Sequence, residues 1–140
     1  MTLFAADTTT MQINHHNPPT LHQNPAFTQV VTVKGSSTLV FIGGQNAVDE
    51  TGKIVGDNLA EQTAQALRNV IAALETVNAT PRNVVRLAIY LVQGHDARDA
   101  FGAARIVWGA HPTAIIVLIV VALANPRFLV EIEATAAVEI

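Results

Sequence analysis

Glu131 and Glu133 stand two residues apart near the end of the chain and are candidates for proton-transfer chemistry. A carboxylate in a cleft can act as a general base and orient a water molecule. The same spacing has a plainer explanation, because side chains two apart on a strand share one face, and glutamates in that pattern usually face solvent. The spacing alone therefore favours a solvated strand face over a catalytic base.

Two further features could bind an anion. Gly44 is the second of two glycines that follow an apolar stretch, and backbone N–H groups there can hold a carboxylate, although such a pair more often marks a bend. Arg105 lies about 40° around its predicted helix from Phe101 and about 60° from Trp108, at 100° per residue. This is the edge of the apolar stripe, where an arginine stem commonly runs along the rim of the core. The alternative is that the guanidinium of Arg105 enters a cleft.

Metal binding and nucleophilic catalysis have little support. Adjacent histidines in an extended segment point to opposite sides, and no carboxylate cluster accompanies His15, His16 or His22, so we expect these three to be exposed and no metal to bind. Ser36 and Ser37 have no histidine or acid at triad-like positions. The absence of cysteine excludes thiolate nucleophiles and disulfides.

The composition limits the partners. With 140 residues and 14.9 kDa the chain fits one domain, and a charged fraction of 14% against the usual value of about 25% indicates that another subunit covers some apolar surface. A net charge of -3 argues against a nucleic-acid partner. The longest apolar run, 114–124, is too short to span a bilayer. The first residues do not form a signal peptide, so we expect a cytoplasmic protein without a membrane partner.

The elements that would position these residues follow from periodicity. Residues 1–24 predict a loosely ordered N-terminal arm and residues 25–140 a single domain. Strands are predicted at 29–34 and 38–42, joined as a hairpin through Gly35-Ser36-Ser37. Further strands are predicted at 84–92, 115–121 and 129–133.

Two helices separate these strands. Asn58 and Glu61 have capping-box spacing at the start of a helix of about five turns, and Asp96 can cap a second helix whose apolar side includes Phe101 and Trp108. The order is β-β-α-β-α-β-β, an α+β fold with two helices on one face of a mixed sheet. Because 115–121 is apolar on both faces, the uncovered face is best explained by self-association in a closed ring.

Several short motifs, in order along most of the chain, resemble those of the Rid family, the YjgF-type reactive intermediate deaminases. They are AFTQVV at 26–31, LVFIGGQ at 39–45, GKIVG at 52–56, EQT at 61–63, VVRL at 84–87, HP at 111–112 and LVEIEA at 129–134. The resemblance implies a chorismate-mutase-like fold and a homotrimer with a central barrel and ligand clefts between subunits. Active members hydrolyse enamines and imines, releasing ammonia without metal or cofactor.

The resemblance also implies which residues form the cleft. Gly44 matches the glycine whose N–H faces the ligand, and Glu131 matches the glutamate that orients water. Phe27 replaces the family's tyrosine and lacks its hydroxyl. Ile115 replaces the arginine that binds the substrate carboxylate, and Val117 is expected to line the cleft as well.

Two functions remain open, and only the second gives Arg105 a role. The first is a protein that binds a small molecule in an apolar intersubunit cleft, either without catalysis or on a ligand lacking the usual α-carboxylate. The alternative is an imine or enamine hydrolase that uses Gly44, Glu131 and Arg105, which stands at a helix position where the family usually has an asparagine. A ribonuclease or translation inhibitor is disfavoured by the pI of about 5.9.

Overall fold

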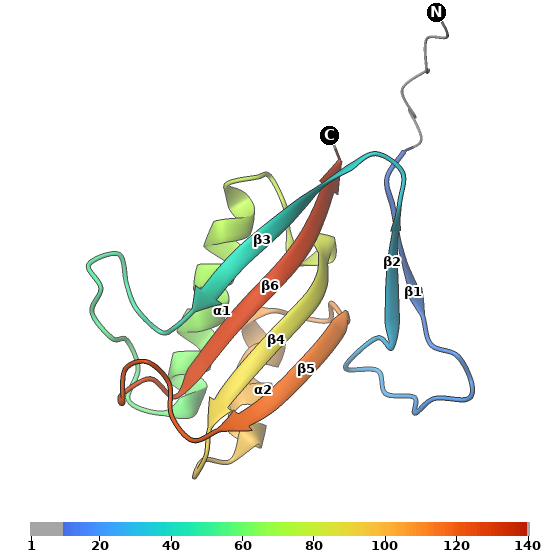
Figure 1. Ribbon diagram of the computed structural model, residues 1–140. Helices are drawn as coiled ribbons and strands as arrows, with labels where there is room; N and C mark the ends of the chain where they lie inside the picture. Colours follow the sequence, from blue (N-terminus) through green and yellow to red (C-terminus); the bar gives the residue numbers. More distant parts are fainter. Residues whose placement is uncertain (1–9, 140) are drawn as a thin grey trace, which may run out of the picture.

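The computed structural model describes residues 10–139, and its centre is a four-stranded sheet with the order β3-β6-β4-β5 (Figure 1). The elements in chain order are β1 (Gln12–His16), β2 (Val30–Lys34), β3 (Ser37–Gln45), α1 (Leu59–Glu75), the 3-10 turn η1 (Pro81–Asn83), β4 (Val84–Val92), α2 (Ala97–Val107), β5 (Ala114–Val120) and β6 (Val130–Glu139). Residues 1–9 of the predicted arm lie outside the described residues.

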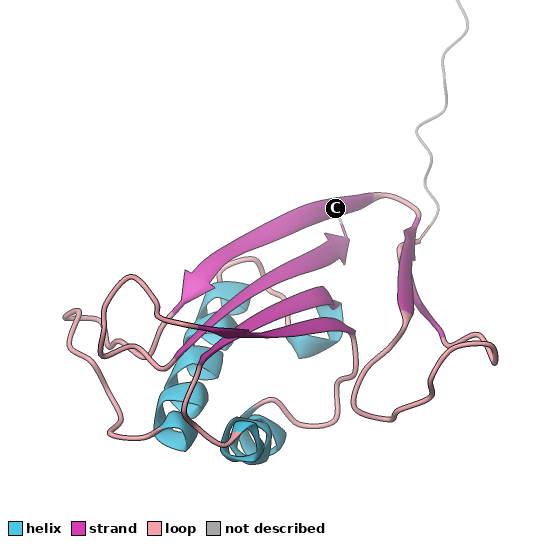
Figure 2. Cartoon of the chain, turned by 60° about the horizontal axis from the view of Figure 1, so that its bottom comes forward, coloured by secondary structure: helices cyan, strands magenta, loops and turns pink. Residues whose placement is uncertain are grey.

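The sheet is mixed, because β4 and β5 run parallel while β6 is antiparallel to both β3 and β4. Both helices lie on one side of it (Figure 2), which confirms the predicted α+β class with two helices on one face. Asn58 caps α1 by accepting a 2.9 Å hydrogen bond from the Glu61 N–H, and Asp96 caps α2 by accepting one from the Arg98 N–H.

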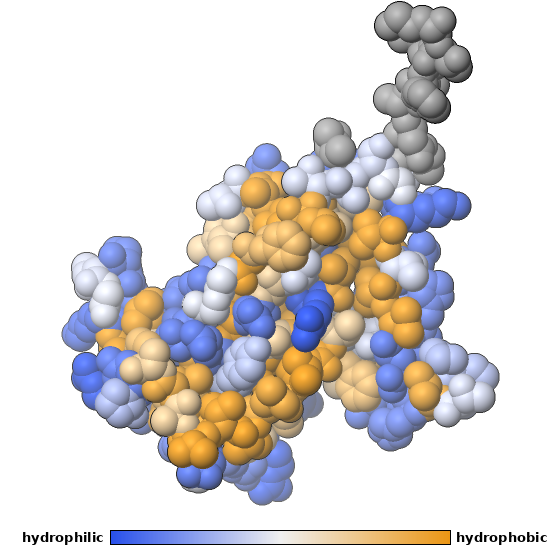
Figure 3. All heavy atoms as spheres, viewed as in Figure 1, coloured by the Kyte–Doolittle hydropathy of each residue, from blue (hydrophilic) through white to orange (hydrophobic). Residues whose placement is uncertain are grey.

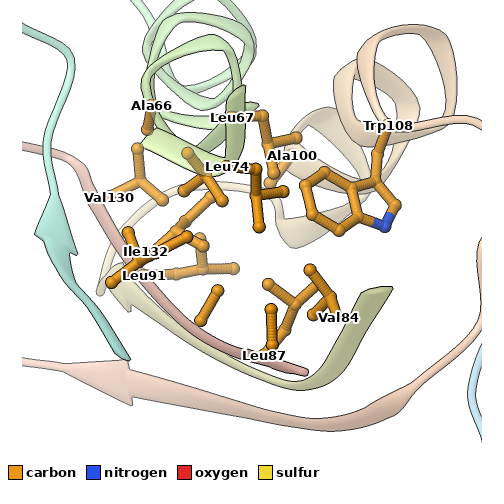
Figure 4. Packing of buried hydrophobic residues seen from close by; sticks show 14 of the residues in the cluster. Ala66, Leu67, Leu74, Val84, Leu87, Leu91, Ala100, Trp108, Val130 and Ile132 are labelled. Atoms are coloured by element: carbon orange, nitrogen blue, oxygen red, sulfur yellow. The ribbon is translucent and has the colours of Figure 1, made fainter. Parts of the chain in front are cut away.

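The core lies between the sheet and the helices (Figure 4). Leu67 and Leu74 of α1 pack there against Leu91 of β4 and Ile132 of β6, all of which are almost fully buried. The 3.6-residue period of α1 and the two-residue period of the strands together produce this core. Phe101 is an exception on α2, because its side chain is 46% exposed rather than part of the buried face.

The predicted hairpin of strands 29–34 and 38–42 is wrong. β2 pairs with β1, with Val33 opposite Ile13, whereas β3 pairs with β6, with Phe41 opposite Thr135. The physical reason is that a short loop permits a hairpin without requiring one. Here Gly35 and Ser36 carry the chain from β2 into β3, and β2 forms its ladder with β1 instead.

The segment assigned to the arm contains an element that the sequence analysis did not predict. Residues Gln12–His16 form β1, which joins β2 in a two-stranded ribbon beside the main sheet (Figure 1). Only Ile13 in this strand is apolar, so no alternating pattern marked it. The backbone hydrogen bonds to β2 stabilise this strand, although its amino-acid composition does not predict one.

Candidate functional site

The Glu131 carboxylate lies over Gly44. Val130 and Ile132 on either side of Glu131 are fully buried toward the helices, so Glu131 points to the opposite, open face of the sheet. A Cβ on Gly44 would lie only 2.7 Å from Glu131 Oε1 and 2.8 Å from Cδ. Glycine therefore leaves the space that the carboxylate occupies, and the structure brings these two predicted site residues together.

A polar row runs along the same open face on β4 and β6. Tyr90 Oη donates a 2.8 Å hydrogen bond to Glu133 Oε1, and this bond, with the nearby carboxylate charges, raises the pKa of Tyr90 above its usual range. Arg86 lies on the same face, and with Glu133, Thr135 and Phe41 it lines a cavity of about 460 Å³. No role was predicted for Arg86 and Tyr90, because their shared face depends on strand register.

Phe27 lies in a different place, in a second cavity of about 460 Å³. Its segment is fixed beside the start of β5 because the Thr28 N–H donates to the Thr113 carbonyl at 2.9 Å. Thr28 Oγ1 also lies 3.0 Å from His15 Nδ1. The cavity is half lined by polar side chains that the sequence analysis did not connect with Phe27, namely His15, Asn17, Asn24, Thr28, Arg82 and His111.

Ile115 and Val117 lie on β5, the edge strand of the sheet. Ile115 is level with Leu87 of β4 and packs against the hydrophobic core. Val117 is level with Ile89 and is 36% exposed. Neither residue lines either of the two cavities described above.

Arg105 is exposed on α2 and also lines neither cavity. Within residues 10–139 its guanidinium forms no ion pair, since the ion pair found there joins Arg98 to Asp96. The structure of the single chain therefore does not bring Arg105 together with Gly44 and Glu131.

The candidate residues thus form two groups. Glu131 of β6 is the register partner of Tyr90 on β4, and Tyr90 is the partner of Leu118 on β5. The first residue of β5, Ala114, is instead the partner of Arg86, four residues earlier on β4. Phe27 lies near that beginning, while Gly44 and Glu131 lie where β3 ends and β6 starts (Figure 1). One chain by itself does not bring Phe27 and Glu131 into one cavity.

The described residues can also be examined for metal-ligating clusters and membrane-spanning helices. His15, His16 and His22 are exposed, as expected, and residues 10–139 contain no cluster of three or more potential metal-ligating side chains. None of the helices described there has the length and apolar character needed to cross a membrane.

The family model described as Endoribonuclease L-PSP matches residues 20–138. This chain belongs to that family. The chain is similar to the Rid-family protein YyfB of Yersinia pestis, with 35% identity, a TM-score of 0.78, and coverage of 90% of this chain and 98% of that one. The predicted resemblance to the Rid family is therefore confirmed.

Two further comparisons agree with this assignment. Rv2704 of Mycobacterium tuberculosis, a member of the YjgF/YER057c/UK114 family, is 31% identical with a TM-score of 0.60, over 80% of this chain and 86% of that one. A RutC family protein of Pyrococcus abyssi is 38% identical over 58 residues, 41% of this chain and 46% of the relative. The chain spans about half the length of the curated relatives it matches.

Proposed function

We propose that this protein binds a small molecule in clefts between the subunits of a cytoplasmic homotrimer. The separation of Phe27 from the Gly44–Glu131 pair is the observation that supports it. A second copy packed against the open sheet face could bring one chain's Phe27 group to its neighbour's Glu131 group. Assembly of a site from two copies is a common result of closed cyclic symmetry.

We also propose that the protein lacks α-imino acid deaminase activity. At the position of the family's carboxylate-binding arginine, Ile115 supplies neither charge nor hydrogen bonds, and it packs on the core side of β5. Phe27 keeps the aromatic ring of the family's tyrosine but has no proton to donate. The loss of a bidentate charged contact in a desolvated site costs several kcal/mol of binding, roughly as for other charge-assisted pairs.

One observation favours the alternative, an imine or enamine hydrolase that releases ammonia. The close approach of Glu131 to Gly44 is the arrangement in which a carboxylate could orient water beside a backbone N–H. Arg105 would enter this function only if a neighbouring copy carried it to the cleft.

Nucleic acid is not part of the proposal, although the family carries the word endoribonuclease in its name. The chain has 8 basic against 11 acidic residues, and a ribonuclease needs cationic side chains along a phosphate backbone. No metal or cofactor is part of the proposal either.

The first prediction tests the choice between the two functions. In a coupled assay that follows 2-aminoacrylate above its spontaneous hydrolysis, we expect no acceleration by the wild-type protein, because no arginine stands at position 115 to hold the carboxylate. A boiled sample of the same preparation gives the background rate. Rapid turnover by the wild-type chain would replace the binding-protein proposal with the hydrolase.

A further inference from the structure

The open face of the sheet carries a cavity that is separate from the one at Phe27. It has a volume of about 460 Å³ and is lined by side chains of β3, β4 and β6, among them Arg86 and Glu133. It shares no lining residue with the Phe27 cavity. Both helices lie on the other side of the sheet (Figure 2), so they do not cover it. A ligand in this cavity would therefore occupy a second site.

Two opposite charges line this cavity without pairing. Thr135 of β6 is the register partner of Arg86, and Glu133 is the partner of Ala88. Arg86 and Glu133 are thus diagonal neighbours on one face of the sheet, within reach of the same small molecule. Within residues 10–139 no ion pair joins them, and the guanidinium of Arg86 forms no hydrogen bond there. Both charges are therefore available to a ligand.

The carboxylate of Glu133 is held in place from one side. Tyr90 Oη donates a 2.8 Å hydrogen bond to its Oε1, and no other hydrogen bond to this carboxylate forms within residues 10–139. The bond restricts the rotation of the side chain and leaves Oε2 to accept from another donor. An ammonium group presents three N–H donors and forms charge-assisted hydrogen bonds with a carboxylate. Glu133 is therefore suited to bind a primary ammonium.

Arg86 supplies the complementary charge. A guanidinium presents paired N–H groups that match the two oxygens of a carboxylate. An anion without an ammonium would bind Arg86 but would also face the like charge of Glu133, and a cation without a carboxylate would face Arg86. A molecule that carries both groups satisfies both residues.

The neutral part of the lining limits the body of the ligand. Ala88 stands between Arg86 and Tyr90 on β4, and its small side chain leaves space above the sheet. Phe41 lies opposite Thr135 and is exposed, so its ring offers a flat surface against which an aliphatic chain can pack. A volume of about 460 Å³ suits a small organic molecule rather than a polymer.

From this arrangement we propose that the open-face cavity binds a free amino acid with an apolar side chain, whose carboxylate pairs with Arg86 and whose ammonium pairs with Glu133. The inference goes beyond the proposed function, because this site is separate from the cleft to which Phe27 belongs. Since a second copy is expected to cover the open face, the amino acid would be enclosed within the assembly. Exclusion of water there would strengthen both charge contacts.

The test is calorimetric titration of the full chain with three molecules of similar shape. They are L-leucine, 4-methylpentanoate, which lacks the ammonium, and 3-methylbutylamine, which lacks the carboxylate. We expect the wild-type protein to bind leucine more tightly than either analogue. Arg86→Gln should weaken leucine binding about tenfold, as expected for the loss of one charge-assisted contact, without weakening 3-methylbutylamine. Glu133→Gln should weaken leucine binding by a similar factor without weakening 4-methylpentanoate.

Arg68→Gln and Glu75→Gln are the matched controls and should bind leucine as the wild-type protein does. Both positions are exposed on α1 and line neither cavity. Light scattering of each variant shows whether the assembly is kept.

Four results would overturn the inference. They are no measurable binding of leucine, no preference of the wild-type protein for leucine over its analogues, wild-type leucine affinity in Arg86→Gln or Glu133→Gln, and an equal loss of affinity in the controls. Leucine binding that is weakened by Arg82→Gln but not by Arg86→Gln would assign the ligand to the Phe27 cavity instead. Dissociation of Arg86→Gln, together with a wild-type protein that binds no leucine, would assign the two charges to contacts between copies.

Discussion

At the scale of single residues, the contact between Gly44 and Glu131 is the most specific feature of the candidate site. The spacing of Glu131 and Glu133 alone favoured a solvated strand face, and both side chains do point to the open face of the sheet. What the spacing could not reveal is that Glu131 fills the space left by a glycine on the neighbouring strand. The resemblance to the Rid family supplied this pair because it carries information about residues distant in sequence.

A double-mutant cycle tests this contact. We expect Gly44→Ala to lower the free energy of unfolding slightly, because the new Cβ forces the Glu131 carboxylate to rotate away. In a Glu131→Ala background the same substitution should stabilise the protein by about 0.4–1 kcal/mol, the usual gain from restricting the unfolded chain at an unstrained position. Urea unfolding of the four proteins measures the coupling. Equal effects of Gly44→Ala in both backgrounds would mean that the two residues do not touch.

Tyr90 gives a second prediction at this scale, and it is the only tyrosine in the chain. Its hydrogen bond to Glu133 raises its pKa, so tyrosinate absorbance should appear at a pH above the ordinary midpoint of about 10. The stabilisation from this bond is present below the unfolded pKa and is lost as the pH rises through the folded pKa. Glu133→Gln should move the midpoint back toward the ordinary value, and an unchanged midpoint would refute the assignment.

At the scale of elements, local signals predicted those parts of the fold that local physics determines. The capping residues Asn58 and Asp96 marked both helix starts correctly, and β-branched runs marked β4 and β5. Strand pairing was predicted wrongly at β2 and β3 because a short loop permits a hairpin but does not require one. The donors around Phe27 could not be predicted, because spacing does not show that Arg82 and His15 meet in one cavity.

Gln62 shows how α1 holds the segment before β6, which carries Glu131. Its side chain is buried, donates to the Arg127 carbonyl at 3.1 Å and accepts from the Leu129 N–H at 2.9 Å. We expect Gln62→Leu to lower the free energy of unfolding by about 1–3 kcal/mol, because it leaves partly buried backbone groups without their partners. Arg68→Leu, exposed on the same helix, should change it by less than about 0.5 kcal/mol. Similar effects of the two substitutions in urea unfolding would contradict this role.

At the scale of the whole molecule, the open sheet face is unusually apolar for a surface. Hydrophobic atoms gather over both edges of the sheet, and hydrophilic atoms lie between them (Figure 3). Leu39 and Phe41 of β3 are 54% and 76% exposed, and Ile116 and Leu118 of β5 are 41% and 43% exposed. Two exposed apolar patches on the edge strands of one sheet are typical of an interface, and we expect a second copy of the chain to cover them.

The last prediction concerns assembly through this face. Light scattering of the wild-type protein should give three times 14.9 kDa, since burial of the open face stabilises the ring by roughly 25 cal/mol per Å² of apolar surface. Phe41→Glu should dissociate the trimer, because assembly would then bury an unpaired carboxylate. Ile106→Glu is the matched control, since Ile106 is 86% exposed on α2 in the helical layer, and it should leave the mass unchanged. A monomeric wild-type protein, or dissociation by Ile106→Glu but not by Phe41→Glu, would show that this face is not the interface and that the cleft is not shared between subunits.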